Sequence, residues 1–379
     1  MTARLAHRFH GPEDGPVLVL SGSLGTTAEA VWGEQLPALA KRHRVLAYDH
    51  RGHGASETPP GPYSIEDLGR DLLDLLDGLG IARVSFCGLS LGGMVGLWLA
   101  GAAPERVERL ALLCTSARLG TPEGWDERIA AVRRGGVGSI ADSVVAGWFT
   151  PDFAAREPET VRRRREALSG TPVEGYLGCC AAIRDFDFSD RLAGVAAPAL
   201  VVSGLQDTAA PVEHQAALAA RIPQSRLVVL DGAAHLAPVE QGPAVAAALL
   251  SHLHPGEGTR LERGEAVRRE VLGDAHVDAA LAATTPFTED FQRYLTGAAW
   301  SDVWARDGID RRTRSAVTLT ALLAANRMEE FALHVRAARR NGLGAEEIGE
   351  VILNAAVYLG VPAANDGFRV AAEALSGAT

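Results

Sequence analysis

The chain has 379 residues, of which 47% are hydrophobic and 22% charged, and its formal net charge is −10. This composition is ordinary for a globular protein, and the length allows two domains because one core usually serves roughly 100–200 residues. The negative charge argues against nucleic acid as a partner, since that needs a basic surface. It also means that an anionic ligand must be held by locally placed arginines.

The cysteines and the apolar stretches bear on the cellular compartment. The four cysteines form no CxxC pair and no metal-ligand spacing, which favours a reducing cytoplasm. The first residues lack the apolar core of a signal peptide. The uncharged stretch 84–104 has the length of a membrane span, but its glycines predict a buried strand, turn and helix instead. We therefore expect a cytoplasmic protein with no membrane partner.

The first part of the chain alternates apolar runs with segments of helical pattern. The runs predicted as strands are 16–22, 44–49, 83–88, 109–116, 198–204 and 226–232. Such runs, separated by helices, predict a parallel sheet covered on both faces. A helix is predicted over 64–80, with Ser64 three residues before Asp67 as its cap. The region from about 118 to 190 is helical and rich in Arg and Trp, which predicts a lid inserted between two strands.

The motif GLSLG, at residues 88–92, follows an apolar run and precedes a helical pattern. In this context G-x-S-x-G is typical of a nucleophile elbow, a tight turn that lifts a serine hydroxyl above the sheet. The N-terminus of the following helix favours developing negative charge. Ser90 is thus the candidate nucleophile, and a glycine-rich turn with an incidental serine is the alternative.

A serine nucleophile needs a base, and the base needs a carboxylate that orients it. Asp207 follows one predicted strand and His235 follows the next. Each residue alone could be a helix cap or a loop histidine. Together they complete the order Ser, Asp, His, with each at the C-terminal end of a strand, where open α/β sheets keep their sites. We therefore predict a catalytic triad of Ser90, Asp207 and His235.

Backbone amides should form an oxyanion hole next to the nucleophile. One amide is expected from Leu91, directly after Ser90. The other is expected from the glycine-containing loop SGSLGTT, with Ser23 as the first candidate and Leu24 as the second. A plain turn is the alternative role for this loop.

Several motifs together resemble the 3-oxoadipate enol-lactonase branch of the α/β-hydrolases over residues 7–253. They are SGSLGTT, YDHRGHGAS, GLSLGG, GWFTPDF, CAAIRDFD and LDGAAHLAPVEQ. The resemblance implies an α/β-hydrolase fold with a helical lid, and an activity that opens a small lactone carrying a carboxylate. Trp148 and Arg184 of the lid, or Arg133 and Arg134, are then candidates for binding that carboxylate. Lid packing and solvated charge are the alternative roles of each.

Beyond His252 the pattern changes. We predict a first domain over 1–254, a linker over 255–263, where Pro and Gly interrupt a charged run, and a second domain over 264–379. No strand pattern occurs in the second domain. The helices predicted there are 264–273, 287–306, 311–326, 327–342 and 344–360. The second domain is therefore expected to be all-α.

Glu330 and His334 are four residues apart, so they lie on one face of their predicted helix. From spacing alone, a surface pair of little consequence is the favoured interpretation. The surrounding stretches VRREVLGDAHVD, WSDVWARDGIDRRTRS, NRMEEFALHVRAARRNGL and EEIGEVILNAAVYLGVPAAND resemble 4-carboxymuconolactone decarboxylase over residues 264–376. Related thiol peroxidases use a CxxC pair, and because no cysteine follows Cys180, we exclude that activity.

The resemblance implies a decarboxylation in which the lactone ring is its own electron sink, so neither a metal nor an organic cofactor is expected. It assigns His334 as the proton donor, with Glu330 orienting it or tuning its pKa. Arg268 and Arg314 are candidates for carboxylate binding. His276 and Trp304 are weaker candidates, and a structural role is the alternative for both.

The two resemblances together imply consecutive steps, because the product of the second domain is the substrate of the first. We expect a fused enzyme for protocatechuate breakdown that acts on small anionic lactones and forms a homo-oligomer through its helical domain. The alternative is a general esterase, or a cofactor-free haloperoxidase, joined to a helical oligomerisation module.

Overall fold

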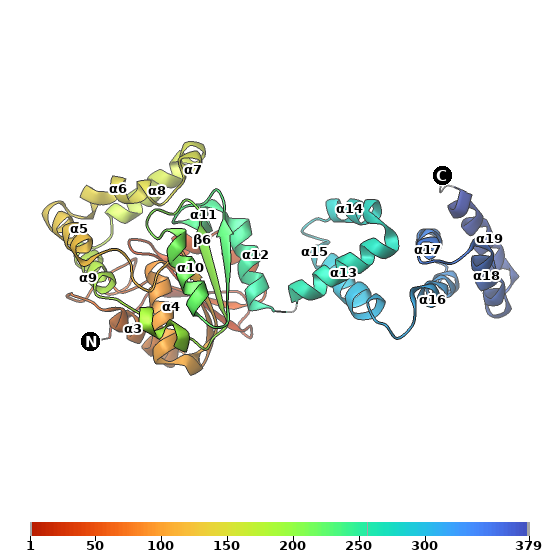
Figure 1. The fold of residues 1–379 in the computed structure, drawn as a ribbon, viewed down its shortest axis with the longest axis horizontal. Coiled ribbons are helices and arrows are strands. Elements are labelled where there is room, and N and C mark those ends of the chain that lie inside the picture. The colour runs from red at the N-terminus through yellow and green to blue at the C-terminus, as the bar shows by residue number, and fades with distance from the viewer. Residues whose placement is uncertain (1, 256, 377–379) are drawn as a thin grey trace. The chain divides into compact units, whose positions relative to one another are not determined.

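The structure, a computed structural model of the chain, describes residues 2–255 and 257–376. Contacts divide it into two compact units after Leu253, one residue before the expected boundary (Figure 1). Within the described residues, none of the helices combines the length and the apolar character that a bilayer crossing requires.

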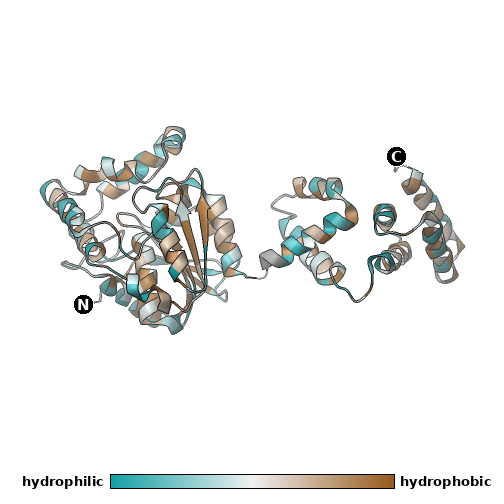
Figure 2. Cartoon of the chain, viewed as in Figure 1, coloured by the Kyte–Doolittle hydropathy of each residue, from teal (hydrophilic) through white to brown (hydrophobic). Residues whose placement is uncertain are grey.

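The first unit is built on a seven-stranded sheet with the order β1-β3-β2-β4-β5-β6-β7. The strands are β1 (His7–His10), β2 (Val17–Ser21), β3 (Arg44–Tyr48), β4 (Val84–Leu89), β5 (Val107–Leu113), β6 (Ala199–Gly204) and β7 (Ser225–Leu230). Neighbouring strands from β3 to β7 pair in parallel, and β1 pairs antiparallel with β3. The strands are coloured mainly as hydrophobic residues (Figure 2), as expected for a sheet buried on both faces. The parallel sheet predicted from the sequence is therefore confirmed.

Helices follow most strands, and their ends agree with the local sequence. Ser64 caps α3 in a capping box, because its hydroxyl accepts from the Asp67 amide and the Asp67 carboxylate accepts from the Ser64 amide. Helix α4 packs on β4 and β5, and α10 packs on β6 and β7. The helices outside the lid are α1 (Ala28–Trp32), α2 (Leu36–Leu39), α3 (Ile65–Gly78), α4 (Leu91–Ala102), η1 (Pro104–Arg106), α10 (Val212–Arg221), α11 (Ala237–Glu240) and α12 (Gly242–Leu253).

The lid lies between β5 and β6 in the chain and is helical, as predicted. Its elements are α5 (Pro122–Gly135), η2 (Val137–Ile140), α6 (Ala141–Ala146), α7 (Pro151–Arg156), α8 (Pro158–Ser169), α9 (Val173–Arg184) and η3 (Ser189–Gly194). Helix α9 meets the loop after β3 backbone to backbone. A Cβ on Gly175 would lie 2.3 Å from the carbonyl oxygen of Gly52, and Gly52 itself has a φ of +75°. Neither position has room for a side chain, so these two glycines determine how closely α9 packs against the loop after β3.

The second unit is all-α, as predicted. It comprises α13 (Glu257–Leu272), α14 (Asp274–Ala282), α15 (Glu289–Leu295), the π-helix η4 (Thr296–Trp304), α16 (Arg311–Ala324), α17 (Met328–Arg340), α18 (Ala345–Leu359) and α19 (Val361–Ser376). One of its cores lies among α16 to α19 around Phe331, Val335 and Ile352. A second core, around Val271, Trp300 and Trp304, holds α13 against η4.

The expected linker over 255–263 is wrong for most of its length, because α13 already begins at Glu257. Arg260, Glu262 and Arg263 of the expected linker lie on this helix. The guanidinium of Arg260 pairs with the Asp302 carboxylate, and Arg263 Nε donates to Ser301 Oγ at 2.9 Å. Long-range partners on η4 thus favour a helix where the composition indicated a linker.

Candidate active sites

Ser90 lies in the tight turn between β4 and α4, with φ +54° and ψ −111°. A Cβ on Gly88 would lie 2.3 Å from the backbone of Gly92, and one on Gly92 would lie 2.6 Å from Ser21 Oγ. Only glycine fits both positions, so the sequence dictates this strained turn. The Ser90 amide donates to the Leu113 carbonyl at 2.9 Å. The turn has the geometry of a nucleophile elbow.

His235 and Asp207 stand on the loops that follow β7 and β6. His235 Nδ1 lies 2.9 Å from Asp207 Oδ2, and both residues are buried. The other carboxylate oxygen, Oδ1, accepts from the amides of Ala209 and Ala210 at 2.8 and 2.9 Å. These bonds fix the carboxylate, which in turn orients the imidazole. Ser90 and His235 line one cavity, and no hydrogen bond joins their side chains within residues 2–255, as is common before substrate binds.

The two loop amides expected at the oxyanion hole differ in their bonding. The Ser23 amide donates to Thr26 Oγ1 at 2.9 Å. Leu24 lines the cavity, and no described hydrogen bond engages its amide. The amides of Leu24 and Leu91 are therefore the better candidates for binding the oxyanion. The Ser23 amide would first have to break its hydrogen bond to Thr26.

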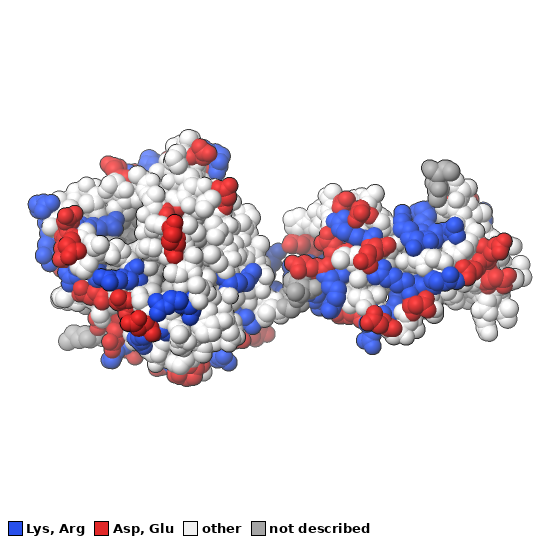
Figure 3. Space-filling view, in the orientation of Figure 1, with Lys and Arg blue, Asp and Glu red and all other residues white. Residues whose placement is uncertain are grey.

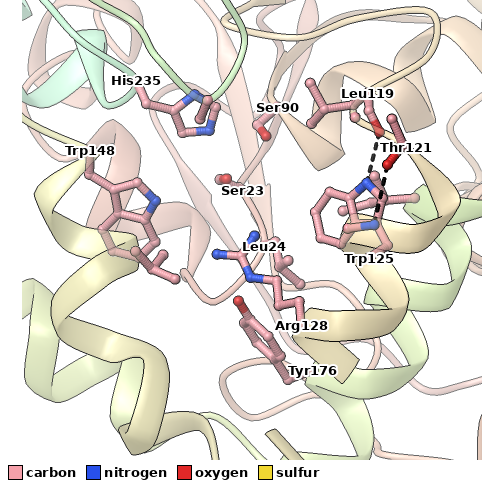
Figure 4. A pocket seen from close by; sticks show the side chains of 15 residues that line it. Ser23, Leu24, Ser90, Leu119, Thr121, Trp125, Arg128, Trp148, Tyr176 and His235 are labelled. Carbon is pink, nitrogen blue, oxygen red and sulfur yellow. Dashed lines mark hydrogen bonds between the residues drawn. The ribbon is translucent and has the colours of Figure 1, made fainter. Parts of the chain in front are cut away.

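The cavity has a volume of about 240 Å³ and lies between the sheet and the lid. Figure 4 shows Ser90 and His235 along one side, Trp148 and Trp125 across from each other, and Arg128 with Tyr176 at the far side from the nucleophile. The rest of the wall is mainly apolar. The lining residues are Ser23, Leu24, Ser90, Leu119, Gly120, Thr121, Gly124, Trp125, Arg128, Val144, Trp148, Tyr176, Ile183, Ala209 and His235.

Of the lid residues predicted to bind a carboxylate, only Trp148 lines this cavity. Arg184 pairs with Asp126 at 2.7 Å and with Asp185 at 2.8 Å, and it lines a separate groove together with Arg133. Arg134 is exposed. The three arginines therefore lie outside the site that holds Ser90, and their assignment to it is wrong. Helix α5 instead directs a different arginine, Arg128, into this cavity. The sequence pattern of the helix does not show which of its arginines faces the cavity.

The lid is bonded to the loop of the catalytic histidine. Glu240 Oε1 accepts from both the amide and the hydroxyl of Thr150 at 2.8 Å. Its Oε2 accepts from the Ala234 amide at 2.5 Å. In addition, the Leu236 amide donates to the Trp148 carbonyl at 2.9 Å. One carboxylate thus joins the lid to the segment that carries His235, a role the sequence did not reveal.

The second unit brings its predicted site residues into one neighbourhood. The His334 ring of α17 stacks on the Trp304 ring with centroids 6.2 Å apart. The guanidinium carbon of Arg314 lies 5.9 Å from that same ring. The charge of His276 acts on His334, and that of Arg268 acts on His276. Helices α13, α14, η4 and α17 share one core, and α16 contributes Arg314 next to Trp304. One of these elements is a π-helix, a feature frequent at functional sites.

Glu330 is exposed, and no hydrogen bond or ion pair joins it to His334 within residues 257–376. Burial and the charge of His276 lower the pKa of His334 below the ordinary histidine value, and the charge of Glu330 opposes them. Of the two roles expected for Glu330, the geometry thus fits the tuning of the pKa and not the orientation of the ring.

Within residues 257–376, three buried side-chain donor atoms have no hydrogen-bond partner: Arg268 Nε, Arg314 Nε and Trp300 Nε1. Arg268 is only 4% exposed, and its Nη1 donates to Gln292 Oε1 at 3.1 Å. Unsatisfied buried donors are costly and call for an explanation. Acceptor oxygens of an anionic ligand would satisfy them, which fits the predicted role of both arginines.

A groove of about 540 Å³ opens beside His276, and Arg336 and Arg340 of α17 line it. Both arginines are exposed, and neither was predicted as a site residue. Burial, Arg268 and these two arginines lower the pKa of His276. The groove therefore presents positive charge next to the neighbourhood of His334.

Comparison with known proteins agrees with the division of the chain into two units. Residues 15–241 match the family model of the alpha/beta hydrolase fold. The 3-oxoadipate enol-lactonase 2 of Acinetobacter baylyi is 40% identical over 237 residues, which cover 62% of this chain and 88% of that protein. The crystal structure of the enol-lactonase from Burkholderia xenovorans LB400 has a TM-score of 0.65 and 42% identity, and the match covers 66% of this chain and 96% of that one.

Residues 289–373 match the model of the carboxymuconolactone decarboxylase family. The 4-carboxymuconolactone decarboxylase of Acinetobacter baylyi is 42% identical over 114 residues, which cover 30% of this chain and 85% of that protein. Each match falls within one of the two units. The chain therefore belongs to the α/β-hydrolase fold family through its first unit and to the carboxymuconolactone decarboxylase family through its second.

Proposed function

We propose that the first unit hydrolyses the enol-lactone of 3-oxoadipate. The observation that carries this is that the elbow serine and His235, whose ring is paired with the buried Asp207, line one small cavity. Ser90 attacks the ring carbonyl while His235 takes its proton, and backbone amides stabilise the oxyanion. The ring oxygen leaves as an enolate, which needs little acid assistance. The enolate becomes a ketone by taking a proton at carbon, which balances the proton that His235 took from Ser90 and returns His235 to its neutral form. Water activated by His235 then releases the product from Ser90.

The second unit decarboxylates 4-carboxymuconolactone and thereby supplies that enol-lactone. Loss of CO₂ pushes an electron pair through the ring double bond onto the lactone carbonyl, and one proton then enters at the far carbon. The neighbourhood of His334 supports this role, because it combines a proton donor with the unsatisfied donors of Arg268 and Arg314. Since the substrate carries its own electron sink, the step needs only charge stabilisation and proton delivery.

The order of the steps is tested with a Ser90→Ala protein fed 4-carboxymuconolactone. We expect CO₂ release at the wild-type rate and accumulation of the enol-lactone, because the second unit has no cysteine and no elbow serine to open the ring. Opening of supplied enol-lactone should fall by roughly 10³-fold or more, as for other triad knockouts. The wild-type protein should form 3-oxoadipate with the lactone only transient.

Two outcomes would contradict the proposal. A Ser90→Ala protein that stalls before CO₂ release would show that lactone opening comes first or that the second unit is no decarboxylase. Near-normal lactone opening by the same protein would remove Ser90 from the mechanism. A general esterase would prefer simple esters over the enol-lactone in the wild-type protein.

We also propose that the chain associates with copies of itself through the second unit. Of the fifteen large hydrophobic residues described as exposed, twelve lie between 281 and 368, although this unit is the smaller one. Phe287 is 96% exposed, and Val357 and Tyr358 of α18 are about 80% exposed. Apolar surface on this scale marks an interaction site. A cytoplasmic location is likewise a proposal, supported by four buried cysteines in the thiol form.

A further inference from the structure

Arg128 is a cation in the catalytic cavity with no acidic partner. It lies on α5, and no ion pair joins it to a carboxylate among the described residues. Its guanidinium carbon lies 5.3 Å from the Trp125 ring and 6.0 Å from the Tyr176 ring. Trp125 is itself fixed, because its Nε1 donates to the Leu119 carbonyl at 2.7 Å. The two rings thus hold the guanidinium in place without neutralising it.

The hydroxyl of Tyr176 adds a second donor at the same end of the cavity. Tyr176 is fully buried, and no acceptor among the described residues takes the proton of its hydroxyl. Burial raises the pKa of Tyr176, so the hydroxyl keeps its proton and remains a donor. Figure 4 shows it pointing toward Arg128. An uncompensated charge and a buried orphan donor are both costly unless an acceptor arrives.

The rest of the cavity lining offers no carboxylate to these two donors. No Asp or Glu is among its lining residues, and Leu24, Val144 and Ile183 make much of the wall apolar. Ser90 and His235 lie at the opposite side from Arg128 and Tyr176 (Figure 4). A ligand whose carbonyl meets Ser90 can therefore direct an anionic group at the two donors. A neutral ligand could accept hydrogen bonds there but would leave the charge of Arg128 uncompensated.

We propose that Arg128, assisted by the hydroxyl of Tyr176, binds the carboxylate of the lactone and makes the first unit selective for anionic over neutral substrates. This inference rests on the proposed lactonase activity. The carboxylate is remote from the reacting carbonyl, so the contact holds the ground state and the transition state alike. Its loss therefore raises KM and leaves kcat nearly unchanged.

The test compares 3-oxoadipate enol-lactone with its methyl ester, in which the same ring lacks the negative charge. For Arg128→Gln we expect kcat/KM on the anionic lactone to fall about 10- to 100-fold, through KM, as for the loss of a charge-assisted hydrogen bond. The rate on the methyl ester should stay within about twofold, which also shows that the variant is folded. Arg128→Lys should keep part of the selectivity, and Tyr176→Phe should lose a smaller part. Arg163→Gln, an exposed lid arginine outside the cavity, is the matched control and should change neither rate.

An equal loss on both substrates would overturn the inference, because it would indicate a structural role for Arg128. An unchanged ratio would overturn it as well. If the wild-type protein opened neither lactone, the proposed function would fail on its own. The role of Arg128 would then be decided with 4-nitrophenyl hydrogen adipate and 4-nitrophenyl hexanoate, an anionic and a neutral ester. Loss of preference for the anionic ester in Arg128→Gln supports the assignment, and an unchanged preference rejects it.

Discussion

His53 Nε2 accepts a hydrogen bond from the backbone amide of Gly25 at 2.8 Å, which ties a buried histidine to the loop that carries Leu24. An accepting Nε2 places the ring proton on Nδ1, which lies 3.2 Å from the Arg51 carbonyl. Burial lowers the pKa of His53 to about 4 and that of nearby His50 to about 3. Both rings therefore stay neutral at the pH of the cell, and the loop next to the nucleophile stays anchored.

The two buried, neutral histidines should make the stability of the first unit decrease at acidic pH. Below pH 6.5 the unfolded chain binds protons at these histidines while the folded chain does not, so stability falls as the pH drops toward about 4. For His53 alone we expect a loss of about 2 kcal/mol in the free energy of unfolding between pH 7.5 and 5. Urea titrations that follow lactonase activity at both pH values measure it for the first unit. His53→Gln should lose part of this pH dependence, and exposed His7→Gln should retain it. An equal pH dependence in all three proteins would contradict the prediction.

Removal of the carboxylate that joins lid and histidine loop should slow catalysis. In Glu240→Ala the amides of Thr150 and Ala234 lose their acceptor, so the loop next to His235 becomes less well placed. We expect kcat for lactone opening to fall about 10-fold or more, since small displacements of catalytic groups are costly. Glu240→Gln keeps one acceptor oxygen and should lie between Ala and wild type. Stopped-flow or steady-state lactonase assays check this order, and full activity of Glu240→Ala would refute it.

Decarboxylation should depend on His334 and on pH. His334→Gln removes the ionisable proton, and we expect loss of CO₂ release with unchanged opening of supplied enol-lactone. Because the pKa of His334 is lowered, the protonated donor becomes more populated as the pH falls, so kcat/KM for decarboxylation should rise toward acidic pH. His276→Gln removes a positive neighbour and should shift this profile to higher pH. A wild-type CO₂ rate in His334→Gln would show that the histidine only packs against Trp304.

The exposed apolar face of α18 should control the oligomeric state. We expect the wild-type protein to sediment as an oligomer, and Val357→Glu combined with Tyr358→Glu to sediment at lower mass, because charges would be buried without partners. Val229→Glu, at an exposed valine of the first unit, is the control and should leave the mass unchanged. A monomeric wild-type protein at micromolar concentration would contradict the prediction. Charges of both signs are interspersed over the visible face of each unit (Figure 3), so high salt alone should not separate the copies.

Much of the fold follows from local pattern. The strands that were predicted are largely continuous apolar runs, and the central strands of a parallel sheet, buried on both faces, favour such runs. The strand β1, HRFH, was missed because it is a polar edge strand that pairs antiparallel with β3. Helix α13 was partly missed because its stability comes from partners on η4, about 40 residues away. Local composition contains no information about such partners.

In the candidate sites, too, the residues fixed by local sequence pattern were predicted and those fixed by long-range contacts were missed. Ser90, Asp207 and His235 were predicted because each follows the end of a strand. The apolar runs of the sequence reveal where these strands end. Arg128 was missed and Arg133 and Arg134 were predicted instead. All three share one amphipathic helix, and only tertiary packing decides which one faces the cavity. Glu240 was missed for a related reason, because its bonds join segments 90 residues apart.

The backbone contact between Gly52 and Gly175 has a consequence for how substrate preference can diverge. Gly175 directly precedes Tyr176, so the distance between two glycine backbones sets the depth at which the tyrosine hydroxyl enters the cavity. An alanine at either position would push α9 outward and withdraw that hydroxyl while the triad stayed intact. A single methyl group at the contact between Gly52 and Gly175, which never touches the substrate, can therefore change the preference for charged lactones.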